Sequence, residues 1–78
     1  MKLLVRNLAR TTTEHAIRTL FSAHGTVGAC QLVLDQESGQ SKGFAFVEMP
    51  NDDEATQAIE ALNLSLVDKS KIRVKVAQ

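Results

Sequence analysis

The sequence predicts an α+β fold, in which two helices pack on one face of a four-stranded antiparallel sheet. Four short segments alternate apolar and polar residues with the period of a β-strand, and two others repeat apolar residues at helical spacing. Their order along the 78-residue chain is β-α-β-β-α-β. Because each helix must bury an apolar stripe, both pack on the same face of the sheet, and the other face is left open.

The chain begins with a strand and a helix. Residues 2–8 are predicted as a strand that ends at Asn7. Three consecutive threonines, starting at Thr11, are N-cap candidates for the first helix, and Thr11 and Glu14 have the spacing of a capping box. Apolar residues then recur at helical spacing, and Gly25 is expected to end this helix.

Two strands joined by a polar loop come next. Residues 29–34 and 43–49 have the composition and alternation of strands. Residues 35–42 contain a Ser-Gly pair that is typical of a turn. Pro50 closes the third strand, because proline cannot donate a hydrogen bond to a sheet.

The second half of the chain adds a helix and the last strand. Asn51 or Asp52 can cap the second helix, and Asn51 and Glu54 have the cap spacing again. The helix ends near Asn63, and residues 71–76 alternate strictly as the last main strand. Between them we expect Leu64, Leu66 and Val67 to cover the helix end as a short extra strand, followed by a turn from Asp68 to Ser70. The complete order is the split β-α-β, or ferredoxin-like, arrangement.

Alternation within each strand assigns its side chains to the core or to the open face. The residues expected to face the core are Leu3, Val5, Cys30, Leu32, Leu34, Ala45, Val47, Met49, Ile72, Val74 and Val76. Those expected on the open face are Lys2, Leu4, Arg6, Gln31, Val33, Phe44, Phe46, Glu48, Lys71, Arg73 and Lys75, with Lys42 at its rim. This face therefore combines two phenylalanines with several cations and a single acid, which is the pattern of a single-strand nucleic-acid binder.

The composition is that of one small globular domain. The formal net charge is zero, with nine basic and nine acidic residues. This balance argues against a nonspecific polycation and permits a local basic patch. The single cysteine, Cys30, can form no internal disulfide and no cysteine metal cluster. With no apolar run long enough for a membrane span and no signal peptide, we expect a cytoplasmic protein without a membrane partner.

Two segments of the chain resemble the sequence motifs of the RNA recognition motif family. The stretch from Lys42 to Met49, Lys-Gly-Phe-Ala-Phe-Val-Glu-Met, is similar to the longer ribonucleoprotein motif at seven of eight positions. Residues 3–8, Leu-Leu-Val-Arg-Asn-Leu, resemble the shorter motif. The resemblance covers essentially the whole chain, so residues 1–78 are expected to form a single domain of this family, similar to the small single-motif RNA-binding proteins of bacteria.

The resemblance implies roles for individual residues. It implies that Phe46 stacks on a base, that Phe44 inserts between riboses, and that Lys42 pairs with a phosphate. Leu4 stands where the family usually has a further stacking aromatic. Since stacking is worth about 1–3 kcal/mol per base, this departure implies a binder of modest affinity.

We expect the open face to bind single-stranded RNA over roughly two to four nucleotides. Weak binding of single-stranded DNA is left open. Phosphate contacts are expected from Lys2, Arg6, Arg73 and Lys75, while Gln31 and Glu48 are candidates for hydrogen bonds to base edges.

A protein-interaction module is the alternative. Leu4, Val33, Phe44 and Phe46 would then form an exposed apolar patch, and such patches mark contact sites. We expect a monomer, with weak self-association through this patch left open.

An enzyme is not expected from this sequence. His15 and His24 have no nucleophile beside them and no cysteine or paired carboxylate at ligand spacing. The sequence therefore predicts no catalytic residue, no cofactor and no metal site.

Overall fold

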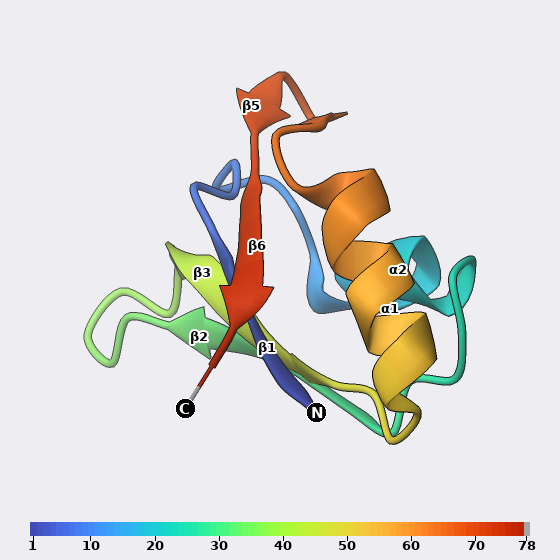
Figure 1. The fold of residues 1–78 in the computed structure, drawn as a ribbon. Helices are drawn as coiled ribbons and strands as arrows, with labels where there is room; N and C mark the ends of the chain where they lie inside the picture. The colour runs from blue at the N-terminus through green and yellow to red at the C-terminus, as the bar shows by residue number, and fades with distance from the viewer. Residues whose placement is uncertain (78) are drawn as a thin grey trace.

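The computed structural model describes residues 1–77 and confirms the predicted α+β, ferredoxin-like architecture (Figure 1). In chain order the elements are β1 (Lys2–Arg6), α1 (Glu14–Ser22), β2 (Ala29–Leu34), β3 (Ser41–Glu48), α2 (Asp52–Leu62), β4 (Leu66–Val67), β5 (Ser70–Lys71) and β6 (Arg73–Val76). The predicted last strand is thus divided into β5 and β6, and the expected extra strand before it is β4.

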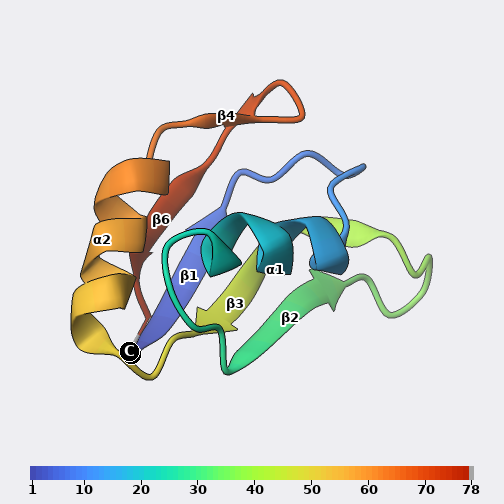
Figure 2. The same ribbon diagram turned by 90° about the vertical axis from the view of Figure 1, so that its right-hand side faces the viewer.

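The four longer strands form an antiparallel sheet in the order β2-β3-β1-β6, and β4 pairs with β5 in a separate hairpin. Both helices lie against one side of the sheet, as predicted (Figures 1 and 2). Its two central strands, β3 and β1, contain the segments that resemble the longer and shorter ribonucleoprotein motifs. Side chains from both segments therefore emerge side by side on the side without helices.

The hydrophobic core lies between the helices and the sheet. Its fully buried members are Leu3, Val5, Phe21, Ala45, Val47, Met49, Ala55, Ala58 and Ile72, each with 0% exposure. They come from β1, β3 and both helices, with Ile72 between β5 and β6. Strand alternation therefore predicted the core side of the two central strands correctly, including the buried Met49 just after β3.

Thr13, rather than Thr11, caps α1. Its hydroxyl accepts a hydrogen bond from the backbone N–H of Ala16 at 3.1 Å. The predicted capping box between Thr11 and Glu14 is wrong, because the Glu14 carboxylate instead accepts a hydrogen bond from the backbone N–H of Leu32 at 3.1 Å. Since β2 is an edge strand, this contact occupies a backbone donor at the outer edge of the sheet.

A side chain from α2 does the same at the opposite edge. Asn63 is the C-cap of α2, and its Oδ1 accepts a hydrogen bond from the backbone N–H of Val74 in β6 at 2.9 Å. Both edge strands of the sheet are therefore tied to a residue at an end of a helix.

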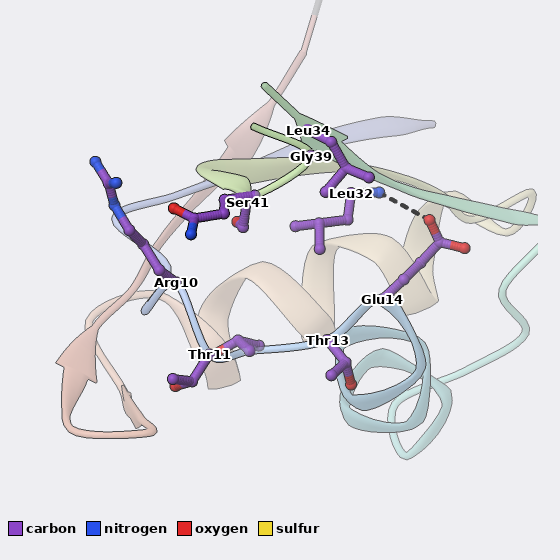
Figure 3. Close-up of a pocket in the computed structure, with 10 residues that line it drawn as sticks. Arg10, Thr11, Thr13, Glu14, Leu32, Leu34, Gly39 and Ser41 are labelled. Atoms are coloured by element: carbon purple, nitrogen blue, oxygen red, sulfur yellow. Dashed lines mark hydrogen bonds between the residues drawn. The ribbon is translucent and has the colours of Figure 1, made fainter. Parts of the chain in front are cut away.

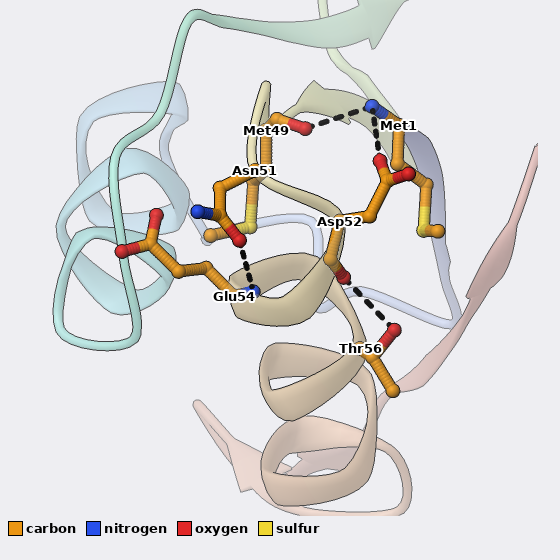
Figure 4. Close-up of polar contacts among 6 residues, drawn as sticks. All are labelled: Met1, Met49, Asn51, Asp52, Glu54 and Thr56. Atoms are coloured by element: carbon orange, nitrogen blue, oxygen red, sulfur yellow. Dashed lines mark hydrogen bonds and ion pairs between the residues drawn. The ribbon is translucent and has the colours of Figure 1, made fainter.

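The N-terminus of α2 is capped as predicted. The Asn51 side chain accepts a hydrogen bond from the Glu54 backbone N–H at 3.0 Å (Figure 4). The Met1 ammonium group donates to the Met49 carbonyl at 2.8 Å and lies 3.7 Å from a carboxylate oxygen of Asp52. These contacts join the start of β1 to the start of α2, where acidic residues also complement the helix dipole.

Gly25 lies beyond the end of α1, which stops at Ser22 with Ala23 as its C-cap. Glycine is needed here for a close approach. A Cβ at Gly25 would lie 2.5 Å from the Cβ of Glu54. The Glu54 carboxylate also accepts a hydrogen bond from the backbone N–H of Thr26 at 3.1 Å. The loop after α1 is therefore packed directly against α2.

Two residues that were predicted to face the core are exposed instead. Leu34 is 49% exposed and Val76 is 42% exposed. The pairing of β2 with β3 shifts register between Leu32 and Leu34, and such an irregularity breaks the alternation of side chains. Val76 is the last residue of an edge strand, where it pairs only with Leu3 of β1.

The short β4–β5 hairpin covers the end of α2 less than expected. Leu66 is 73% exposed and Leu64 is 52% exposed, so among the predicted covering residues Val67 alone packs against the core. The turn begins at Asp68, and this residue and the next have positive φ values of 50° and 70°, as two-residue hairpin turns require. Asp68 accepts a hydrogen bond from the Thr12 hydroxyl at 2.7 Å, which joins the hairpin to the segment before α1.

Candidate nucleic-acid interface

A row of side chains crosses the open face from one edge of the sheet to the other. Phe46 on β3 pairs with Gln31 on β2 and with Leu4 on β1, and Leu4 pairs in turn with Lys75 on β6. The structure therefore brings together four of the residues that the sequence assigned to this face. The order is amide, aromatic, aliphatic and cation.

Further predicted residues flank this row on both sides. On one side, Glu48 pairs with Lys2 on β1 and with Ala29 on β2. On the other side, Arg6 pairs with Arg73 of β6. Because side chains two residues apart on a strand share a face, all of these except Ala29 were predicted here from alternation alone.

Phe44 and Phe46 form a preorganised aromatic pair. Their ring centroids are 6.2 Å apart and their planes are at 88°, which is the favoured edge-to-face arrangement. Both side chains are half-buried, so the rings are held against the sheet and still expose surface. The Lys2 Nζ lies 4.7 Å from the Phe46 ring centroid, in a cation–π contact that the sequence did not reveal.

The phenylalanine pair opens onto a shallow hollow on the sheet. Leu4, Arg6, Phe44 and Phe46 line it. Leu4, Phe44 and Phe46 supply apolar surface, and the Arg6 guanidinium supplies a cation at the border of the hollow. This is the arrangement that stacking of an unpaired base beside a phosphate requires.

The cations of the open face lie on one half of the sheet. Lys2 and Arg6 come from β1 and Arg73 and Lys75 from β6, and all four are exposed. Lys71, which was predicted to share this face, is also exposed but lies on β5, in the separate hairpin with β4. Within residues 1–77 the one salt bridge joins the Met1 ammonium group to Asp52, so these side chains are available for external anions. The basic strip therefore runs beside the aromatic pair, along β1 and β6.

The other half of the face bears the hydrogen-bonding groups Gln31 and Glu48. Together with Lys2, Ala29, Cys30 and Phe46 they line a small hollow of about 90 Å³. Both side chains are exposed, so their polar ends reach solvent. An amide and a carboxylate beside an aromatic ring could read the edge of a base stacked on that ring.

Lys42 and Val33 lie apart from this centre. Both line a hollow at the β2–β3 loop, and Val33 does not join the hollow of the phenylalanines. The predicted apolar patch is therefore divided.

The Asp35 carboxyl lies close to Lys42. Hydrogen bonds from the backbone N–H groups of Ser38 and Glu37 lower the pKa of this carboxyl, and the nearby charge of Lys42 adds to this effect. Lys42 thus has an acidic neighbour that the motif alone did not indicate.

Asn7, at the end of β1, has a structural role that the sequence did not reveal. It has a left-handed backbone with φ of 60°, which ends β1 at Arg6. Its side-chain amide donates a hydrogen bond to the Lys71 carbonyl at 2.7 Å. Asn7 therefore ties β5, which bears Lys71, to the end of β1. The signal was available, because asparagine tolerates this conformation better than other non-glycine residues.

A larger hollow, of about 480 Å³, lies on the helix side of the sheet (Figure 3). It is lined by residues from the segment before α1, from β2 and from the start of β3. Several of its polar side chains already have partners within the chain. Glu14 accepts from the Leu32 N–H, Thr13 caps α1, and the Ser41 hydroxyl accepts from the Gly43 N–H at 3.0 Å. The polar side chains that remain are Arg10, Thr11 and Gln40, which include neither an acid nor a histidine for catalysis.

Cys30 is buried in the core as predicted. Burial raises the pKa of its thiol, the charge of Glu14 raises it further, and that of Arg18 lowers it. Such a thiol is a poor nucleophile at neutral pH.

Among residues 1–77, no group of three or more histidine, cysteine or acidic side chains is placed to hold a metal ion. No helix in the same range is long and apolar enough to span a membrane.

Comparison with known sequences gives consistent matches. The family model described as the RNA recognition motif matches residues 3–73. The chain is 44% identical over 63 residues to a protein of Nostoc sp. named RNA-binding protein RbpB. The matched segment covers 81% of this chain and 61% of that protein. It is 38% identical over 77 residues to the 28 kDa chloroplast ribonucleoprotein of Spinacia oleracea, covering 99% of this chain and 33% of that protein. The chain thus spans less than two thirds of either relative.

Solved structures agree with the sequence matches. The crystal structure of RNA Binding Protein PG1 superposes with a TM-score of 0.95 at 35% identity, covering 99% of this chain and 93% of that chain. A Sxl-lethal protein–RNA complex superposes with a TM-score of 0.94 at 30% identity, covering 99% of this chain and 46% of that chain. With a family model matched from β1 to β6, the chain belongs to the RNA recognition motif family.

Proposed function

We propose that this protein binds single-stranded RNA on the open face of its sheet and catalyses no reaction. The observation that carries the proposal is the preorganised pair of Phe44 and Phe46, which lies beside an unpaired strip of cations. The relatives named as an RNA-binding protein and a ribonucleoprotein support the same function. So does the RNA complex among the solved structures of similar fold.

The distribution of groups on the face suggests how the RNA lies. Bases stack on Phe46 and Phe44 on β3, and the sugar-phosphate backbone follows the cations on β1 and β6. Lys42 contacts a phosphate at the far end of β3, beside the β2–β3 loop. The exposed Gln31 and Glu48 lie on β2 and β3, outside the cation strip of β1 and β6, where they meet base edges rather than phosphates.

The affinity of this interface is modest. Leu4 occupies the central position next to Phe46 and offers apolar contact without an aromatic ring. Two phenylalanines must therefore supply the stacking on the sheet. We further propose that the protein acts as a monomer in the cytoplasm, needs no metal, and binds single-stranded DNA more weakly than RNA.

Replacing both phenylalanines by alanine tests the proposed function. Since stacking contributes about 1–3 kcal/mol per base, the variant Phe44→Ala/Phe46→Ala is expected to bind short single-stranded RNA at least roughly 30-fold more weakly. Fluorescence anisotropy with a labelled oligonucleotide measures this loss, and circular dichroism verifies that the variant is folded.

The matched control removes two exposed apolar side chains elsewhere. Leu64→Ala/Leu66→Ala lies in and just before β4, away from the open face, and is expected to bind RNA like the wild type. A folded phenylalanine variant with undiminished RNA affinity would contradict the proposal. It would favour the protein-interaction alternative, which is weakened here because Val33 lines a separate hollow from Phe44 and Phe46.

A further inference from the structure

We infer that Glu48, together with Lys2, makes the interface selective for guanine at the nucleotide whose base stacks on Phe46. This inference rests on the RNA-binding function proposed above and names the base that the site prefers. It starts from one feature of the open face, which is that its single acid has no partner.

Glu48 is an unexpected residue for a surface that binds a polyanion. Its carboxylate is exposed, and within residues 1–77 it accepts no hydrogen bond and has no cation within 4.0 Å. Its register partner Lys2 directs its ammonium group to the Phe46 ring instead. The carboxylate is therefore free to accept hydrogen bonds from a ligand bound on the open face.

The position of Glu48 matches the edge of a base stacked on Phe46. The two residues are two positions apart on β3, so their side chains emerge on one face about 6.6 Å apart. This spacing is close to the distance from the centre of a stacked base to a group that hydrogen-bonds its edge, which is half the width of the base plus about 2.9 Å. The hollow of about 90 Å³ lies between them, and small Ala29, the register partner of Glu48 on β2, leaves it open.

The chemistry of a carboxylate then distinguishes the four bases. An ionised carboxylate only accepts hydrogen bonds, and it can accept two in parallel. Guanine presents two adjacent donors on its Watson–Crick edge, N1–H and the N2 amino group. Adenine and cytosine each place an acceptor nitrogen beside the amino group, and uracil places its one donor between two carbonyl oxygens. Guanine is therefore the one base that offers Glu48 two adjacent donors, while on each other base a second carboxylate oxygen would face an acceptor.

Lys2 completes the recognition of guanine. In the free protein its ammonium group lies 4.7 Å from the centroid of Phe46, on the surface that a stacking base must occupy. A base that stacks there displaces it, and the flexible stem of lysine lets the ammonium group move to the base edge. There it can donate to guanine O6, next to the two donors that Glu48 accepts.

A simpler role for Glu48 would be to reduce the positive charge of the face. The two roles predict different effects of the variant Glu48→Gln. If only charge matters, this variant binds all RNA sequences more tightly by the same factor. If Glu48 reads the base, the variant loses the preference for guanine, because an amide cannot accept two parallel hydrogen bonds from one edge.

The test measures fluorescence anisotropy with short oligouridines that carry one central guanine, adenine or cytosine. For the wild type, we expect the guanine oligonucleotide to bind about tenfold more tightly than the others, near the lower end of what a bidentate contact to a base discriminates. Glu48→Gln is expected to lose most of this ratio, and Lys2→Met part of it.

Glu60→Gln is the matched control, because it makes the same change of charge at an exposed position on α2. It should leave the guanine ratio unchanged. Equal affinities of the wild type for the guanine and adenine oligonucleotides would overturn the inference and leave RNA binding intact. A uniform gain in affinity in Glu48→Gln, with the ratio preserved, would also overturn it. Failure of the wild type to bind any of the RNAs would instead refute the proposed function, and this inference with it.

Discussion

Leu4 lies at the centre of the open face, between Phe46 on β3 and Lys75 on β6. It is half-buried, and it lines the hollow that the phenylalanines share. A side chain in this place touches whatever stacks on Phe46. Its identity therefore affects how strongly the face can bind a second base.

The variant Leu4→Phe is expected to bind single-stranded RNA more tightly than the wild type. A ring at this position adds a stacking surface, and a gain of about 1 kcal/mol corresponds to roughly fivefold in affinity. Fluorescence anisotropy at fixed salt measures the change. Leu4→Met, which keeps an apolar side chain without a ring, is the control and should bind like the wild type. Equal affinities for Leu4→Phe and Leu4→Met would show that no base reaches this position.

Individual side chains of the face were predictable to different degrees. Alternation placed Phe46, Glu48 and Lys2 on one face, because the strand period is two and the central strands are regular. The contact between Lys2 and Phe46 was not predictable, because it depends on the rotamer of a long flexible side chain. The conformation of Asn7 was not assigned either, since a tolerated left-handed backbone is only one of several local options.

At the scale of secondary-structure elements, the helix ends show what local sequence can determine. Asn51 was one of two adjacent cap candidates for α2, and its side chain makes the cap contact. Three consecutive threonines precede α1, and the capping-box spacing to Glu14 favoured Thr11 wrongly. Packing decides, because Thr12 is buried and bonded to Asp68, which leaves Thr13 free to cap.

Replacing the two exposed threonines separately should give different effects on stability. Thr13→Ala removes the acceptor of the Ala16 N–H and is expected to lower the free energy of unfolding by about 1 kcal/mol. Thr11→Ala removes no cap contact and should change it by less than about 0.5 kcal/mol. Urea unfolding monitored by circular dichroism measures both values. The assignment of the cap would be contradicted if Thr11→Ala were the more destabilising variant.

The strands also differ in how well alternation described them. β1 and β3 are central and paired on both sides, so a register error would expose their whole apolar side. The edge strands β2 and β6 are less constrained. A register shift in β2 exposes Leu34, and Val76 at the end of β6 is exposed as well. Alternation is thus most reliable where a strand has a neighbour on both sides.

At the scale of the whole molecule, a neutral chain has an uneven distribution of charge. Four cations of β1 and β6 lie on the open side of the sheet, while α2 begins with three acidic residues on the helix side. Such a molecule presents its basic side to a polyanion even though its net charge is zero.

The salt dependence of RNA binding should report this asymmetry. For single strands, the slope of log K against log salt is about −0.7 for each phosphate neutralised. Arg73→Gln/Lys75→Gln is therefore expected to make the slope shallower by about 1.4. Anisotropy titrations at several salt concentrations measure it. Arg18→Gln, an exposed position on α1, should leave the slope unchanged, and an equal effect there would indicate that RNA does not favour the open side.

The overall fold and the family were predictable from the sequence because two central strands contain specific motifs and both helices have regular apolar stripes. The sequence did not predict that the apolar patch is divided between two hollows. This division follows from where Val33 lies beside the β2–β3 loop, and that depends on the register shift in β2.

The contacts of Glu14 with Leu32 and of Asn63 with Val74 have a consequence for the protein at high concentration. An open sheet has two free edges, and each offers backbone groups to which a strand from another molecule can add. In this protein a helix-end side chain occupies a donor at each edge, so an incoming strand meets an interrupted ladder. At high concentration the molecules are therefore poorer templates for fibrous, cross-β growth than a sheet with two unprotected edges.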